Sequence, residues 1–145
     1  FYDLAPHPLD LLQDMFGVII EAEGICANRA GLYPAEDCVS ACFRFESGLP
    51  GTGSWCFVGH NSSREDCIEI IGDKGMLSFS VYNYAPIQLT TSAGTEYITV
   101  ENPKYVQLPI IKQVIEDLQG IGVCTCRSVN ATPVNWVMDR ILGKL

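Results

Sequence analysis

The chain has 145 residues, enough for one domain, and 48% of them are hydrophobic whereas only 18% are charged. This composition supports a hydrophobic core and argues against disorder, and no apolar run reaches the roughly 18 residues that cross a bilayer. The net charge of −8, with nine thinly spread basic residues, disfavours binding to nucleic acids and to anionic membranes.

The first predicted element is a helix over residues 5–16. Leu9, Leu12 and Phe16 recur at helical spacing and form a single apolar stripe. Pro6 and Pro8 are compatible with the first turn of this helix, where backbone N–H groups have no partner within the helix. The chain starts with Phe-Tyr-Asp rather than Met, so we expect it to be a piece of a longer protein.

The following residues change to the period of β-strands. Residues 18–27 form a β-type run, and residues 38–45 alternate between polar and large apolar side chains. A turn rich in glycine and proline separates this second run from residues 54–58, which predicts a hairpin. Further strands, joined mainly by tight turns, are predicted over 66–71, 76–81, 87–91 and 96–100.

The helical period returns near the end of the chain. Residues 108–118 carry an apolar stripe, and a last helix is predicted with Asn130 as its N-cap and Pro133 in its first turn. A block of hairpin-linked strands with helices at both ends predicts an α+β fold. We expect a mostly antiparallel, open-faced sheet of about six or seven strands, with helices covering one face. The uncovered face is then a candidate surface for a homo-oligomer.

The seven cysteines show no CxxC spacing, and most of them lie in strand-like apolar runs. We expect free, buried thiols, because cysteine in such runs behaves as a small hydrophobic residue. A set of disulfides and a metal site remain less favoured alternatives, and no metal ligand set is predicted. Thiols that stay reduced fit a cytoplasmic protein.

Three stretches resemble the glucose–fructose oxidoreductase and inositol dehydrogenase family (Gfo/Idh/MocA). The stretch from Asp3 to Gly17 is similar to the family's D-x-x-x-H-x-x-D helix, and residues 66–79 are similar to its strand–turn–strand with two glycines. The stretches 106–120 and 135–142 are similar to the family's closing helices. The order of these stretches along nearly the whole chain is more specific than any one of them.

The resemblance implies that residues 1–145 are the C-terminal substrate-binding and oligomerisation domain of a two-domain enzyme. An N-terminal Rossmann domain, absent from this chain, would bind NAD or NADP and carry the family's catalytic lysine in an E-K-P motif. Gly48–Gly53 is glycine-rich, but it lies between predicted strands with no helix after it, so we reject it as a dinucleotide loop. We therefore expect no cofactor site in this fragment.

The family pattern assigns chemistry to the first helix. His7 corresponds to the proton acceptor for oxidation of an alcohol, because imidazole titrates near neutral pH. Asp3, four residues earlier, would orient His7 or bind a hydroxyl, and Asp10 would accept a hydrogen bond from a second hydroxyl. The residues alone also allow Asp3 to cap the helix, His7 to be a surface residue and Asp10 to be a solvated acid. His60, at a strand end, is better explained by a turn.

The favoured function is therefore that of a domain of an NAD(P)-dependent oxidoreductase acting on a sugar, a polyol or a related hydroxy compound. The fragment would be inactive alone. One alternative is a non-catalytic binding or assembly module that uses the open sheet face as a protein–protein interface. A second is a family member with degraded chemistry that retains only binding. The sequence preceding residue 1 distinguishes them, because the enzyme requires a nucleotide-binding fingerprint and the lysine motif there.

Overall fold

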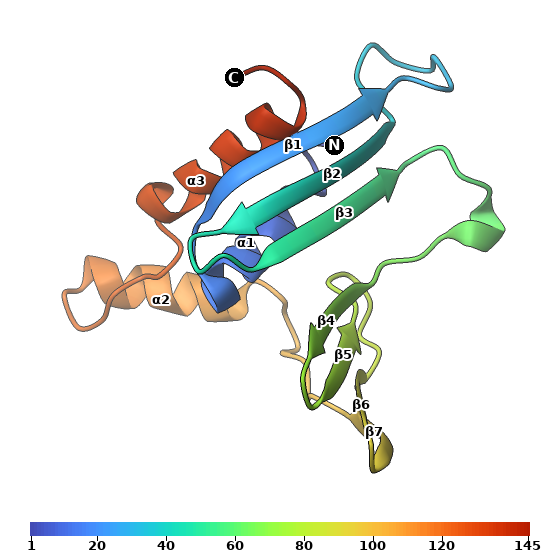
Figure 1. Cartoon of the computed structure of the whole chain (residues 1–145). Coiled ribbons are helices and arrows are strands. Elements are labelled where there is room, and N and C mark those ends of the chain that lie inside the picture. Colours follow the sequence, from blue (N-terminus) through green and yellow to red (C-terminus); the bar gives the residue numbers. More distant parts are fainter. The chain divides into compact units, whose positions relative to one another are not determined.

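The computed structural model describes residues 1–145 except for the side chain of Asn130. Its described part contains three α-helices, seven strands and one short 3-10 turn (Figure 1). These elements form two compact units. The first unit comprises residues 1–63 and 126–145, and the second comprises residues 64–125.

Helix α1 (Pro6–Phe16) opens the first unit, within one residue of the prediction. Its two prolines lie in the first turn, where a missing N–H breaks no bond within the helix. The predicted stripe faces the core, with Leu9 only 1% exposed and Leu12 packed beside it. Gly17 ends the helix with a φ of 89°, a conformation that favours glycine, and its N–H donates to the Gln13 carbonyl at 2.9 Å.

Strands β1 (Ile19–Ala27), β2 (Cys38–Phe45) and β3 (Pro50–Cys56) form an antiparallel sheet in that order. The alternation predicted for β2 is confirmed, because every second side chain is buried. Strand β3 starts at Pro50, four residues before the predicted residue 54. The turn is short, so Pro50 already pairs with Arg44 near the end of β2. The buried residues of β2 are Val39, Ala41, Phe43 and Phe45.

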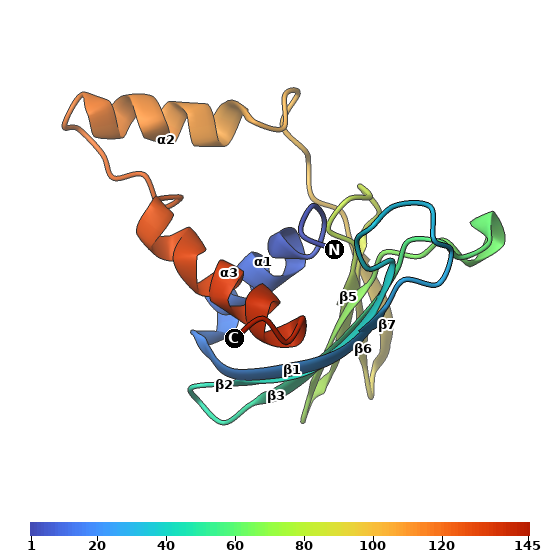
Figure 2. The ribbon, with the colours of Figure 1, turned by 90° about the horizontal axis from the view of Figure 1, so that it is seen from above.

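Helix α3 (Ser128–Ile141) lies with α1 on the same face of this sheet (Figure 2). The predicted start at Asn130 is wrong, because the helix begins at Ser128 and holds Pro133 in its interior. An interior proline removes one hydrogen bond and strains the preceding turn. Burial of the apolar face outweighs this cost, because four side chains of α3 are at most 3% exposed. These are Val134, Val137, Met138 and Ile141.

The second unit contains a four-stranded antiparallel meander, β4 (Ile68–Gly72), β5 (Gly75–Phe79), β6 (Ile87–Thr91) and β7 (Gly94–Ile98). The register places one set of apolar side chains on a common face, here called the apolar face. Most of its members are only half-buried. The apolar face consists of Ile68, Ile70, Leu77, Phe79, Ile87, Leu89 and Ile98.

Helix α2 (Leu108–Leu118) also belongs to the second unit and spans the predicted residues. None of its residues is buried, although its apolar stripe follows the expected period. Leu118 at the end of the stripe is 84% exposed, and Ile111 in the middle is 50% exposed. The helical period was therefore predicted correctly, while the strands of the second unit leave the stripe exposed.

The predicted α+β class is confirmed, with seven antiparallel strands and three helices. The strands are divided between two hydrogen-bonded sheets of three and four strands. None of the described helices is both long and apolar enough to span a membrane.

The cysteines are free in the described chain, but the expectation that most are buried is wrong. Only Cys124 is buried, and Cys38 is half-buried. The strand period explains part of this difference, because Cys38 and Cys42 alternate with the buried side chains of β2 and so face away from the helices. The exposed thiols belong to Cys26, Cys42, Cys56, Cys67 and Cys126.

Candidate functional site

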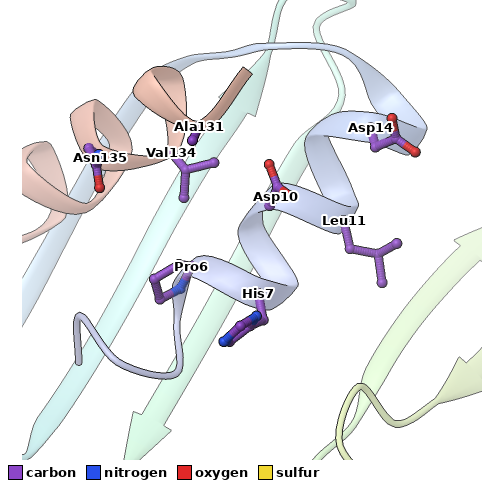
Figure 3. Close-up of a pocket in the computed structure, with 8 residues that line it drawn as sticks. All are labelled: Pro6, His7, Asp10, Leu11, Asp14, Ala131, Val134 and Asn135. Carbon is purple, nitrogen blue, oxygen red and sulfur yellow. The ribbon is translucent and has the colours of Figure 1, made fainter. Parts of the chain in front are cut away.

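A pocket of about 320 Å³ lies between α1 and α3, within the first unit (Figure 3). Its floor includes the buried side chain of Val134, and its polar groups come from both helices. The lining consists of Pro6, His7, Asp10, Leu11, Asp14, Ala131, Val134 and Asn135.

The helical period explains which side of α1 reaches the pocket. His7, Asp10 and Asp14 follow one another at spacings of three and four residues, so they share one side of the helix (Figure 3). The stripe that contains Leu9 lies on the side that packs on the sheet. The helical spacing of the residues thus gives α1 one side that packs on the core and another side that lines the pocket.

The polar lining is dominated by hydrogen-bond acceptors. The Asp10 and Asp14 carboxylates and the His7 imidazole are exposed, and no Lys or Arg is among the described lining residues. Carboxylates are strong acceptors for hydroxyl groups, whereas they repel phosphate and carboxylate groups. This side of the pocket therefore suits a neutral compound with several hydroxyl groups.

Asp3 lies outside this lining, in the exposed turn that precedes α1. Backbone N–H groups of Leu4 and Ala5 close the turn by donating to the Phe1 carbonyl at 3.2 and 3.0 Å. The alternative in which Asp3 caps the helix is wrong, because Ala5 occupies the N-cap position and no side-chain cap bond is present there. The structure brings His7 and Asp10 into one pocket and leaves Asp3 beside it.

A cluster of three side chains ties the turn that carries Asp3 to the end of α3. The Tyr2 hydroxyl donates to Asp139 Oδ1, and Lys144 Nζ donates to the Tyr2 hydroxyl at 3.0 Å. Lys144 Nζ also lies 4.4 Å from the centroid of the Tyr2 ring. Burial, and then the bond to Asp139, raise the pKa of Tyr2, so the phenol stays protonated at neutral pH.

Two polar lining residues, Asp14 and Asn135, were not among the predicted site residues. Asp14 lies four residues after Asp10, so its place on the pocket side follows from the helical period. Asn135 gave no local signal, because its position depends on how α3 packs beside α1. His60 serves the predicted turn, because its Nδ1 lies 2.8 Å from the Ser62 hydroxyl and accepts the Ser62 N–H at 3.2 Å.

The glycine-rich segment Gly48–Gly53 does not fit a nucleotide phosphate. It forms the β2–β3 turn and the first part of β3, where aromatic rings cover Gly51 and Gly53. A Cβ atom on Gly51 would lie 2.2 Å from the Phe43 ring, and one on Gly53 would lie 2.3 Å from the Trp55 ring. These glycines therefore make room for side chains of the same sheet.

Comparison with known families decides the assignment of this fold. Residues 1–78, just over half of the chain, match the family described as the GFO/IDH/MocA C-terminal domain. The chain belongs to this family. The GFO/IDH/MocA assignment confirms the resemblance drawn from the residues of α1 and of the β4–β5 hairpin, the two stretches that the match covers in whole or in large part.

A curated relative and two solved structures extend the comparison to the whole chain. An oxidoreductase of Formosa agariphila is 28% identical over 144 residues, which are 99% of this chain and 43% of the relative. A levoglucosan dehydrogenase in complex with NADH matches with a TM-score of 0.81 and 16% identity, over 97% of this chain and 46% of its own. A UDP-N-acetylglucosamine 3-dehydrogenase of Acidithiobacillus ferrooxidans matches with a TM-score of 0.80 and 14% identity, over 98% and 45%.

These likenesses establish that the chain shares its fold with part of larger oxidoreductases. The chain spans less than half the length of each of these relatives. The activities of the larger proteins belong to chains about twice as long.

Proposed function

We propose that this chain is the C-terminal substrate-binding domain of an NAD(P)-dependent oxidoreductase that acts on a sugar, a polyol or a related hydroxy compound. In this proposal an N-terminal Rossmann domain of the same polypeptide holds the nucleotide. The family assignment and the NADH-bound dehydrogenase of the same fold support it. The observation that carries the proposal is the placement of His7 and Asp10 in one acceptor-rich pocket.

His7 is the proposed acid–base group. Oxidation of an alcohol requires loss of the hydroxyl proton together with a hydride, and bound nicotinamide supplies the hydride acceptor. The exposed imidazole of His7 is the only imidazole among the described lining residues, and imidazole is the side chain most often used for general acid–base catalysis, so it takes the proton in oxidation and returns it in reduction. The two carboxylates along the same side of α1 stabilise the imidazolium that forms.

The carboxylates have a second proposed role in binding. Asp10 accepts a hydrogen bond from a substrate hydroxyl, and Asp14, one turn further, extends the same row of acceptors. Asp3 orients His7 or binds a hydroxyl from the neighbouring turn. The Tyr2, Asp139 and Lys144 cluster holds that turn in place.

The two histidines of the chain provide the test of this proposal. In the full-length enzyme we expect His7→Ala to lower kcat by about 10²–10⁴-fold, the usual contribution of a general acid or base. His60→Ala is the matched control, because His60 bonds to Ser62 in a turn outside the pocket. Steady-state kinetics with a panel of sugars and polyols measures both variants. Equal activity of His7→Ala and the wild type would remove His7 from the mechanism.

The exposed apolar surfaces support assembly with further protein. We propose that copies of the protein associate through the open sheet, with the apolar face of β4–β7 as the contact. The uncovered stripe of α2 is a second surface that favours a protein partner. The same surfaces support the alternative of a non-catalytic assembly module, which predicts association but no dehydrogenase activity in the wild-type protein. The free thiols support a cytoplasmic location.

A further inference from the structure

Cys38 and Cys56 are direct partners across strands β2 and β3. Their sulfur atoms lie 3.6 Å apart, on the sheet face opposite the core residue Val39. The pair lies at the end of the hairpin far from its turn, with Cys56 exposed and Cys38 half-buried. A small rotation about the Cα–Cβ bond of each cysteine would therefore bring the two sulfur atoms to bonding distance.

The hydrogen-bond register shows that this pair is of the close type. Phe57 N–H donates to the Asp37 carbonyl at 2.9 Å, and Phe45 N–H donates to the Leu49 carbonyl at 3.0 Å. Odd-numbered residues of β2 thus form hydrogen-bonded pairs with β3. Cys38 and Cys56 therefore form a non-hydrogen-bonded pair. Cα atoms of such non-hydrogen-bonded pairs lie about 4.5 Å apart, within the range of about 4.4–6.8 Å that a disulfide spans.

We propose that Cys38 and Cys56 form a reversible intrachain disulfide by exchange with a small-molecule disulfide such as oxidised glutathione. A cysteine thiolate attacks one glutathione sulfur, which forms a mixed disulfide and releases one glutathione thiolate. The second cysteine then attacks the protein sulfur of that mixed disulfide and releases the second glutathione. Two protein thiols are oxidised, one glutathione disulfide is reduced to two thiols, and the two protein protons leave with the products.

The order of attack follows from the environment of Cys38. The hydrogen bond with Cys56, aided by burial and by the nearby Asp37 carboxylate, raises the pKa of Cys38 to about 11. Cys38 therefore keeps its proton at neutral pH, and it is also the less exposed of the two thiols. We assign the first attack to Cys56 and the resolving step to Cys38.

The other cysteines of the sheet lack such a partner. Cys42 lies on the same face, but its cross-strand neighbours are Glu23 and Thr52. Cys26 pairs with Val39 and so belongs to the opposite face. A metal site is disfavoured, because no group of three or more His, Cys, Asp or Glu side chains is arranged to hold an ion among the described residues.

Peptide mapping of the full-length protein tests the proposal. After incubation with oxidised glutathione and blocking of free thiols, trypsin cleavage at Arg29, Arg44 and Arg64 yields peptides 30–44 and 45–64. We expect these two peptides to be joined, with a mass two hydrogens below their sum, and to separate after reduction with dithiothreitol. Peptide 30–44 contains both Cys38 and Cys42, so single variants are required to identify the linked sulfur.

Two variants identify the bond and a third validates the assay. Cys56→Ser should abolish the joined peptide, whereas Cys42→Ser should leave it unchanged. Thr52→Cys combined with Cys56→Ser places a thiol opposite Cys42 at an equivalent position, so it should also give a joined peptide. The proposal is overturned if only this engineered pair closes, if the wild-type protein stops at glutathione adducts, or if a non-reducing gel shows the link between two chains.

Discussion

Helix α3 lies close to Gly24 of β1, and a single added methyl group tests that contact. A Cβ atom on Gly24 would lie 2.6 Å from the Ile141 carbonyl oxygen and 2.7 Å from Ile141 Cγ2. It would also lie 3.1 Å from the Ser40 carbonyl oxygen on the neighbouring strand. Two of these three atoms belong to backbone, so a rotamer change cannot relieve the clash.

Gly24→Ala should therefore destabilise the first unit by displacing α3. Overpacking of a core costs about 1–3 kcal/mol, and a clash with backbone on two sides belongs at the upper end of that range. The loss of glycine's flexibility in the unfolded chain offsets about 0.4–1 kcal/mol. We expect a net loss of about 2 kcal/mol in the free energy of unfolding. Because α3 also carries Val134 and Asn135, we expect its displacement to alter the pocket and to lower kcat/KM of the proposed full-length enzyme.

Gly72→Ala is the matched control for this prediction. Gly72 also lies in a strand, and the nearest atom to its added Cβ is the Gly75 carbonyl oxygen at 3.7 Å, an ordinary contact. Urea unfolding of both variants and the wild type, followed by circular dichroism, measures the difference. If Gly24→Ala were as stable as Gly72→Ala, the close packing of α3 on β1 would be incorrect.

Two further predictions concern an acid and a surface. The buried Asp37 carboxylate accepts N–H groups of Arg29 and Ala30 at 2.7 and 2.8 Å, which lower its pKa below the ordinary value of 3.8. The contribution of the Asp37 carboxylate to the free energy of unfolding is therefore present at neutral pH and lost as the pH falls below about 4. The difference in stability between the wild type and Asp37→Asn should close in unfolding curves measured in acid. A difference that stays constant with pH contradicts this. Ile70→Glu on the apolar face should lower the sedimentation coefficient of the full-length protein, whereas Ile71→Glu on the opposite face should not; equal effects would exclude that face.

Features set by local period were predictable from the sequence. The stripe of α1 and the alternation in β2 each repeat within a few residues, and burial follows the same repeat in the structure. The last helix shows the limit of local rules. Asn130 and Pro133 favour a late start, but the helix begins at Ser128, and its first turn carries a bond from the Ala131 N–H to the Arg127 carbonyl at 3.1 Å and one from the Thr132 hydroxyl to the Ser128 carbonyl at 2.8 Å.

Features that join distant residues were not predictable in this way. Tyr2 and Asp139 are 137 positions apart, and neither belongs to a pattern that names the other. The partnership of Cys38 with Cys56 depends on the register of the hairpin, and a shift of one residue would place the two side chains on opposite faces. The sequence identified both strands of that hairpin, while the register came only from the structure.

One side of the pocket follows from spacing within a single helix, whereas the other side depends on packing between distant residues. Mutations can test the two sides separately. The spacing of His7, Asp10 and Asp14 along one helix makes them neighbours in any fold that keeps α1, so the acceptor row is a property of the sequence. The facing wall belongs to α3, whose position depends on the contact between Gly24 and Ile141. A change at Gly24 should therefore weaken substrate binding and leave the pH dependence of kcat intact, whereas a change at His7 should abolish the part of that dependence that reflects proton transfer. The two measurements separate the role proposed for His7 in proton transfer from the packing that shapes the pocket.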